Sequence, residues 1–140
     1  MVAGECLCGA VRYEVDGEIT GIWFCHCSKC RRANGSAFQA GAVSRKESFR
    51  WIRGEGRIAE YRAPSGYRKT FCSNCGSPLP LFPEGTDYVW LPVGALEGDP
   101  AIRPTHHIFV GSKASWFEIT DELPQFEEYG RGRDDERPGA

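Results

Sequence analysis

Seven cysteines, gathered in three short clusters, are the residues of this 140-residue chain best suited to chemistry. They are arranged as Cys6-x-Cys8, Cys25-x-Cys27-x-x-Cys30 and Cys72-x-x-Cys75. An odd number of cysteines cannot all pair within one chain, and thiols one or two residues apart chelate a metal ion more readily than they join each other. The spacing therefore predicts a metal–thiolate protein, with zinc as the metal.

Seven thiolates divide naturally into four and three. A closed structural zinc site takes four tetrahedral ligands, whereas a catalytic zinc commonly takes three from the protein and keeps one position open. The cluster of Cys25, Cys27 and Cys30 is compact enough to hold one ion alone, which leaves Cys6, Cys8, Cys72 and Cys75 for a closed site. A zinc ribbon of Cys27-x-x-Cys30 with Cys72-x-x-Cys75 has comparable spacing, so spacing alone leaves both partitions open. Scattered buried or oxidisable thiols account less well for the clustering.

The segments between the clusters predict an all-β fold. Residues 11–16 alternate apolar and polar side chains, as a half-buried strand does, and Gly17 interrupts them. Most of the other short candidate strands are bounded by Gly, Pro, Ser or Asp; they are residues 19–24, 38–43, 49–52, 57–61, 67–71, 88–93, 107–110 and 116–119.

One short helix is expected directly after the middle cluster. Ser28 is the candidate N-cap of residues 29–34, and Gly35 would end the helix in a left-handed conformation. The amides at the start of this helix would point towards the neighbouring thiolates and lower the cost of gathering negative charge there.

Length and composition favour one domain over residues 1–129, followed by a flexible charged tail over residues 130–140. The net charge of −2 gives no overall field for nucleic acid or an anionic membrane. No apolar run long enough to span a membrane and no export signal is found, so we expect a cytoplasmic protein. Thiols stay reduced in that compartment, which favours metal thiolates over disulfides.

Four stretches, GECLCGAVRYEV, CHCSKCRRANGSAF, FCSNCGSPL and HIFVGSKASWFEITDELPQFE, resemble the glutathione-dependent formaldehyde-activating enzyme family, which also includes centromere-protein-V-like domains. The resemblance covers about residues 4–127. It implies a β-tent zinc fold of short antiparallel sheets with two zinc ions per chain. It also selects the four-plus-three partition, with Cys6, Cys8, Cys72 and Cys75 as structural ligands and Cys25, Cys27 and Cys30 as catalytic ligands.

The activity that the resemblance implies is that of a carbon–sulfur lyase. Glutathione sulfur would add reversibly to formaldehyde, or to a related small aldehyde, and give S-hydroxymethylglutathione or a similar adduct. The chemistry suits an open zinc site, because a free thiol has a pKa near 8.5 and coordination to zinc deprotonates it. Candidate contacts for the glutathione carboxylates are Arg31 and Arg32, which follow the cluster, and after them Lys69 and Lys113.

Histidines and carboxylates are weaker candidates for proton transfer. His26 lies between two proposed ligands, but alternation along an extended segment would point its side chain away from the metal. Of His106 and His107, one is expected to face inward and the other outward. Asp121 and Glu122 follow a predicted strand and are left out of the catalytic set.

The competing interpretation is a zinc module without catalysis that binds protein or nucleic acid. Binding to nucleic acid would require a contiguous basic patch, which this sequence does not reveal. The enzyme therefore remains the first hypothesis.

Overall fold

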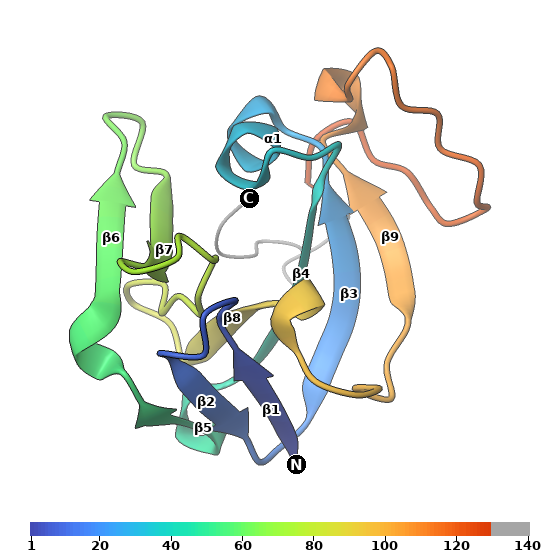
Figure 1. Ribbon diagram of the computed structural model, residues 1–140. Helices are drawn as coiled ribbons and strands as arrows, with labels where there is room; N and C mark the ends of the chain where they lie inside the picture. Colours follow the sequence, from blue (N-terminus) through green and yellow to red (C-terminus); the bar gives the residue numbers. More distant parts are fainter. Residues whose placement is uncertain (130–140) are drawn as a thin grey trace.

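The computed structural model describes residues 1–129, which form three small β-sheets and one short α-helix (Figure 1). The first sheet has the strand order β1 (Val2–Glu5), β2 (Arg12–Val15) and β5 (Phe49–Arg53). The second has the order β8 (Tyr88–Pro92), β4 (Gln39–Arg45), β3 (Ile19–Cys25) and β9 (Pro104–Ile108). The third is the hairpin of β6 (Ile58–Arg62) and β7 (Arg68–Cys72). The all-β fold class is therefore confirmed.

Nearly all neighbouring strands run antiparallel, as predicted, but β3 and β9 are parallel. Their register places Phe24 opposite His107 and Cys25 opposite Ile108. The backbone of His107 in turn pairs with the segment at residues 124–126: its N–H donates to the Pro124 carbonyl at 2.9 Å, and its carbonyl accepts from the Phe126 N–H at 3.0 Å. Segments about 80 residues apart along the chain thus meet at the end of β3.

Most predicted strands overlap an observed one, and the differences have local causes. The strand expected at residues 107–110 is instead Pro104–Ile108, because Phe109 adopts a left-handed φ of 57° that breaks the ladder. Residues 116–119 form no strand, and Trp116 is 73% exposed. The predicted tail at residues 130–140 lies outside the described residues.

Strand β1 was not predicted, because the short stretch VAGE carries no apolar alternation. It forms because it pairs in register with β2, where Gly4 lies opposite Tyr13. A Cβ atom at residue 4 would collide with the Tyr13 ring, so glycine lets the strand cross this buried side chain.

Helix α1 (Ser28–Asn34) is present, but its N-cap is Cys27 and not Ser28 as predicted. The Cys27 sulfur accepts a hydrogen bond from the Cys30 N–H at 3.3 Å. At the other end Gly35 takes the expected left-handed conformation, with φ 59° and ψ 41°. Cys27 both caps the helix and belongs to the three-cysteine cluster, so the start of the helix and the geometry of the cluster depend on the same residue.

Apolar side chains are buried in two clusters, and each cluster includes a different group of cysteines. One contains Tyr13, Leu79 and Leu91 and includes Cys6 and Cys72. The other contains Trp23, Trp90 and Ile108 and includes Cys25, Cys27 and Cys30. Five of the seven thiols are therefore buried, whereas Cys8 is exposed and Cys75 is half-buried.

Candidate active site and metal centres

The first cysteine group joins two turns that are far apart in sequence. The sulfur atoms of Cys6, Cys8, Cys72 and Cys75 all lie within 4.8 Å of one another. Each turn is closed by a left-handed glycine with φ 79°: the Gly9 N–H donates to the Cys6 carbonyl, and the Gly76 N–H to the Cys72 carbonyl. Glycine carries this conformation without the strain that a side chain would add.

The polar surroundings of this group stabilise negative charge on Cys8 and Cys75, whereas burial raises the pKa of Cys6. The Val11 N–H donates to the Cys6 sulfur at 3.3 Å. Contact with the Ser77 hydroxyl lowers the pKa of Cys75 to about 5, and the Asn74 side chain lowers the pKa of Cys8. Four convergent thiols of this kind match the donor set of a closed tetrahedral zinc site.

The second group is formed by Cys25 at the end of β3, Cys27 at the helix cap and Cys30 in the first turn of α1. Their sulfur atoms also lie within 4.8 Å of one another, and their side chains are almost fully buried. Because the helix begins between two of the cysteines, its first turn folds Cys30 back towards Cys25.

Ionisation is unevenly shared in this group. The pKa of Cys27 is lowered to about 2, mainly because the Cys25 thiol and then the Cys30 thiol donate to its sulfur. The pKa of Cys25 is raised to about 12 by the contact with Cys27, and that of Cys30 is raised by Cys25 and then Cys27. Without a cation only Cys27 of the three therefore ionises readily, and a bound zinc ion would allow all three to act as thiolate ligands.

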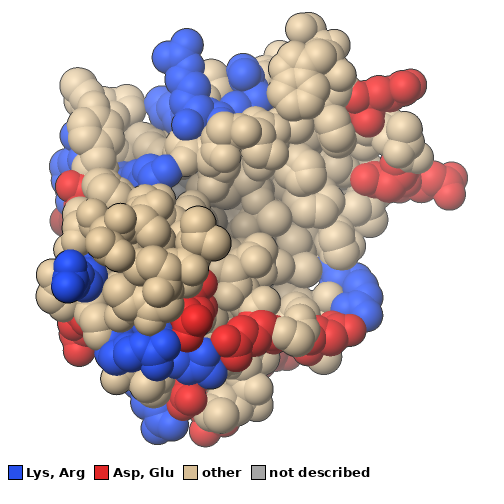
Figure 2. Space-filling view, viewed as in Figure 1, with Lys and Arg blue, Asp and Glu red and all other residues tan. Residues whose placement is uncertain are grey.

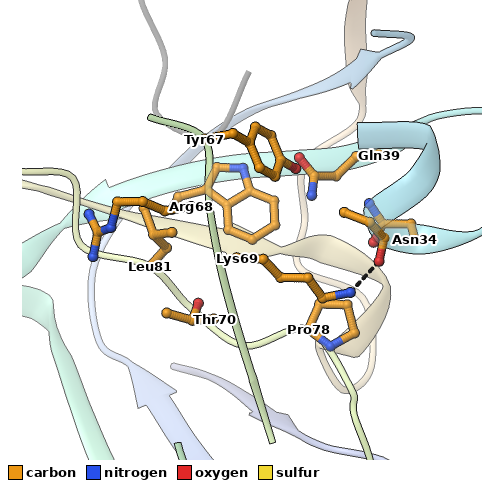
Figure 3. Close-up of a pocket in the computed structure, with 10 residues that line it drawn as sticks. Asn34, Gln39, Tyr67, Arg68, Lys69, Thr70, Pro78 and Leu81 are labelled. Carbon is orange, nitrogen blue, oxygen red and sulfur yellow. Dashed lines mark hydrogen bonds between the residues drawn. The ribbon is translucent and has the colours of Figure 1, made fainter. Parts of the chain in front are cut away.

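Two polar side chains that the sequence analysis did not single out touch Cys30. The Gln39 Oε1 lies 3.3 Å from the Cys30 sulfur, and the Tyr67 hydroxyl lies 3.6 Å from the same sulfur. Figure 3 shows Tyr67 and Gln39 pointing towards one another above the pocket. The register of β4 against β3, where Gln39 pairs with Cys25, brings the amide here, and no pattern in the sequence reveals it.

Three adjoining cavities surround these two side chains. A narrow cavity of about 20 Å³ contains both Gln39 and Tyr67 in its wall (Figure 3). It shares Tyr67, Arg68 and Leu81 with a cavity of about 430 Å³. It shares Asn34, Gln39 and Pro78 with one of about 540 Å³. The face drawn in Figure 2 is hollowed between α1 and strands β1 and β2.

The 430 Å³ cavity has a cationic and aromatic wall. Its lining residues include Lys29 from α1, Tyr67, Tyr129, Arg62 and Arg68, together with the acidic Glu84. Both arginines already face carboxylates: Arg68 binds Glu60 through two hydrogen bonds, and Arg62 binds Glu84. Lys29 is exposed and lies one residue from Cys30.

The four cations proposed from sequence lie elsewhere. Arg31 donates from its Nε to the His26 carbonyl at 3.3 Å, and Arg32 is exposed on the helix. The Lys69 ammonium donates to the Ala33 carbonyl (Figure 3), and that of Lys113 donates to the carbonyls of residues 114 and 117. Of these four, Lys69 lines the narrow cavity, and none lines the 430 Å³ cavity.

A chain of hydrogen bonds leads away from the second cysteine group. His26 Nε2 lies 2.8 Å from His107 Nδ1, and His107 Nε2 lies 3.0 Å from an Asp121 oxygen. The His26 ring packs against Phe38 and Phe117, so its side chain lies on the other side of the backbone from the sulfurs, as alternation predicts. His107 is buried and His106 is half-buried, which agrees with one inward and one outward ring.

Burial lowers the pKa of His26 to about 4, with further lowering from the charges of His107, Lys113 and Arg31 and a weak opposing effect of the Ala37 backbone. The pKa of Asp121 is lowered by the Leu123 N–H and then by His107. Asp121 is not among the catalytic residues predicted from sequence, because a carboxylate after a predicted strand carries no signal of a buried partner.

No helix among residues 1–129 is long and apolar enough to span a membrane. On the face drawn in Figure 2, Lys and Arg side chains form separate groups, one at the top over α1 and others lower down beside Asp and Glu. That face therefore presents no continuous basic surface of the kind that nucleic-acid binding requires.

Comparisons with known proteins agree with this geometry. Residues 1–112 match the model of the family described as glutathione-dependent formaldehyde-activating enzyme. A Halomonas elongata protein named "Putative glutathione-dependent formaldehyde-activating enzyme" is 29% identical over 127 residues, which is 85% of this chain and 81% of that protein. The crystal structure of a Rhodobacter sphaeroides protein is 28% identical, with a TM-score of 0.57, and the match covers 69% of this chain and 89% of that one. With its seven cysteines and this family match, the chain belongs to the glutathione-dependent formaldehyde-activating enzyme family.

Proposed function

We propose that this protein is a zinc-dependent carbon–sulfur lyase that reversibly adds the thiol of glutathione to formaldehyde or a related small aldehyde. The observation that carries the proposal is the division of the seven cysteines into a group of four and a group of three, each with its sulfurs within 4.8 Å. Family membership over residues 1–112 supports the same reaction. The reducing conditions that such thiolates require support a cytoplasmic location.

The residues fit two zinc ions with different roles. Cys6, Cys8, Cys72 and Cys75 would hold a closed structural ion, and Cys25, Cys27 and Cys30 would hold an ion with one open position. When bound at the open site, zinc would keep a coordinated glutathione sulfur deprotonated and therefore nucleophilic at neutral pH.

The protein side chains would then supply orientation and a hydrogen bond. Burial, followed by the charge of Cys30, raises the pKa of Tyr67, so this phenol stays protonated at neutral pH and can donate a hydrogen bond. We assign it the hydrogen bond to the oxygen that becomes negative as the thiol adds to the aldehyde carbon. The Gln39 amide lies beside it and would help to hold the aldehyde.

The carboxylates of glutathione require cations near the thiol. Lys29 lines the cavity of about 430 Å³, together with Tyr67 and Tyr129. Because its ammonium group can pair with an anion, this cavity is the proposed site for one carboxylate. Arg31 and Arg32 stay candidates for the other, because Arg32 is exposed on the helix and Arg31 is half-buried beside it, with its Nε donating to the His26 carbonyl.

The test combines a metal count with an exchange measurement. Native mass spectrometry of the reduced protein should find two zinc ions per chain, and one in Cys27→Ala. Because the adduct also forms without an enzyme, the rate should be read from exchange between ¹³C-formaldehyde and its glutathione adduct by NMR. Cys27→Ala should reduce this rate to the uncatalysed value.

The matched control is Ser28→Ala, the adjacent residue, whose hydroxyl does not cap the helix. It should keep both ions and full activity. If Cys27→Ala retained two zinc ions and wild-type exchange, the assignment of the open site would be wrong.

A further inference from the structure

Two buried imidazoles and one half-exposed carboxylate form a continuous chain beside the three-cysteine group. His26 is fully buried, His107 is 2% exposed and Asp121 reaches solvent. The two links, of 2.8 Å and 3.0 Å, are both within normal hydrogen-bond range. None of these side chains contacts the cysteine sulfurs, so the proposed reaction assigns no role to this hydrogen-bonded chain of three residues.

The carboxylate gives this chain a direction. An ionised Asp121 can only accept, so His107 must present Nε2–H to it. With both rings neutral, His107 Nδ1 is then an acceptor, and His26 must donate from Nε2. The remaining nitrogen, His26 Nδ1, is buried and makes no hydrogen bond of normal geometry to residues 1–129. A single charge at the surface thereby selects one tautomer of each ring.

The two ends of the chain are attached to segments that have to stay in register. His26 lies between Cys25 and Cys27, and its N–H donates to the Ile108 carbonyl at 3.0 Å. Asp121 belongs to the segment that pairs with the His107 backbone, and it also accepts from the Leu123 N–H at 3.0 Å. Both nitrogens of the His107 ring are hydrogen-bonded, so this ring cannot rotate. Through its bond to His26, it holds the peptide that carries Cys25 and Cys27, two of the three cysteines of the group.

We propose that Asp121, acting through His107 and His26, is a positioning residue that holds the Cys25–Cys27 peptide in the geometry that retains a metal ion. The inference rests on the proposed zinc site. Carboxylates that orient metal-binding residues from outside the ligand shell typically change metal affinity by about 10- to 100-fold. Because this chain acts through one peptide and not through a ligand itself, we expect the lower end, about tenfold.

Release of zinc to a chromogenic chelator, with the remaining ions counted by native mass spectrometry, measures this effect. Asp121→Ala should release the ion of the three-cysteine site about tenfold faster. Asp121→Asn keeps an acceptor oxygen and should stay within about twofold of wild type. Glu122→Ala, which removes the same charge from the adjacent exposed residue, should change nothing.

Asp121→Ala also removes the acceptor of the Leu123 N–H, so a second variant separates the two effects. His107→Gln breaks the chain and keeps that turn, and it should release the ion at least as fast as Asp121→Ala. The double variant should be no faster than His107→Gln, because Asp121 acts through His107. Additive effects would overturn the proposal, and urea unfolding of each variant verifies that the fold is kept.

Long-range ¹H–¹⁵N NMR of the imidazoles supplies a readout that general loosening would not produce. In the wild type His26 and His107 should each carry the proton on Nε2 alone, and Asp121→Ala should convert His107 into a mixture of tautomers. The proposal would be refuted if His26 carried its proton on Nδ1 in the wild type. It would also be refuted if Asp121→Ala had the same tautomers and the same rate of zinc release as the wild type. A wild type that binds no zinc at Cys25, Cys27 and Cys30 would instead refute the proposed function.

Discussion

Replacing Tyr67 with phenylalanine removes one hydroxyl beside Cys30 and keeps the ring that lines the cavity. A hydrogen bond to a charged acceptor contributes about 2 kcal/mol. If that bond is made to the developing alkoxide and not to the bound aldehyde, the exchange rate should fall about thirtyfold, since 1.36 kcal/mol corresponds to a factor of ten. Half-buried packing of the ring is unchanged, so the free energy of unfolding should change by less than about 1 kcal/mol.

The assay is ¹³C-formaldehyde exchange at saturating glutathione, together with the zinc count and the urea midpoint of the same preparation. Tyr61→Phe is the matched control, because Tyr61 lies on the neighbouring strand β6 and its side chain is 59% exposed. It should behave as wild type. If Tyr67→Phe kept two zinc ions and an exchange rate within twofold of wild type, Tyr67 would not stabilise the transition state.

Three further predictions concern the frame of the site. Gly54→Ala should cost about 2 kcal/mol more than Gly66→Ala in urea unfolding, because both glycines have positive φ but only at residue 54 would a Cβ collide with the Ala10 carbonyl; equal costs would contradict this. Tyr13→Phe should stabilise the protein by about 1 kcal/mol, because the buried Tyr13 hydroxyl has no hydrogen-bond partner among residues 1–129; a loss of stability would show that the hydroxyl is satisfied. Burial lowers the pKa of His26 to about 4, so below the unfolded value near 6.5 the unfolded chain binds a proton that the native state does not. Between pH 7 and pH 5 the free energy of unfolding should therefore fall by about 2 kcal/mol more in the wild type than in His26→Phe; parallel pH profiles would refute it.

Local signals in the sequence were sufficient for most elements. Alternation predicted β2, and Gly35 predicted the end of α1, because both depend on neighbours within a few residues. The same reasoning failed where contacts with distant residues decide whether a strand forms. Strand β1 exists through its pairing with β2, and residues 116–119 carry strand-forming side chains but have no partner strand.

The start of the helix shows a subtler limit. Serine is a common N-cap, and Ser28 was the natural choice, yet the Cys27 sulfur accepts the first hydrogen bond. The cap moved by one residue because Cys27 also has to face Cys25 and Cys30, and gathering the three sulfurs fixes where the helix begins.

The sequence by itself determined that thiols within each cluster lie close together, because cysteine spacing of one or two residues brings sulfurs together whatever the rest of the chain does. Spacing left open which cysteine clusters combine into one group. The packing of the Cys6–Cys8 turn against the Cys72–Cys75 turn decided it. Only the tertiary structure placed Gln39 and Tyr67 on Cys30 and linked His26 through His107 to Asp121. These contacts join residues from 9 to 81 positions apart, and strand register, which no local pattern encodes, brings them together.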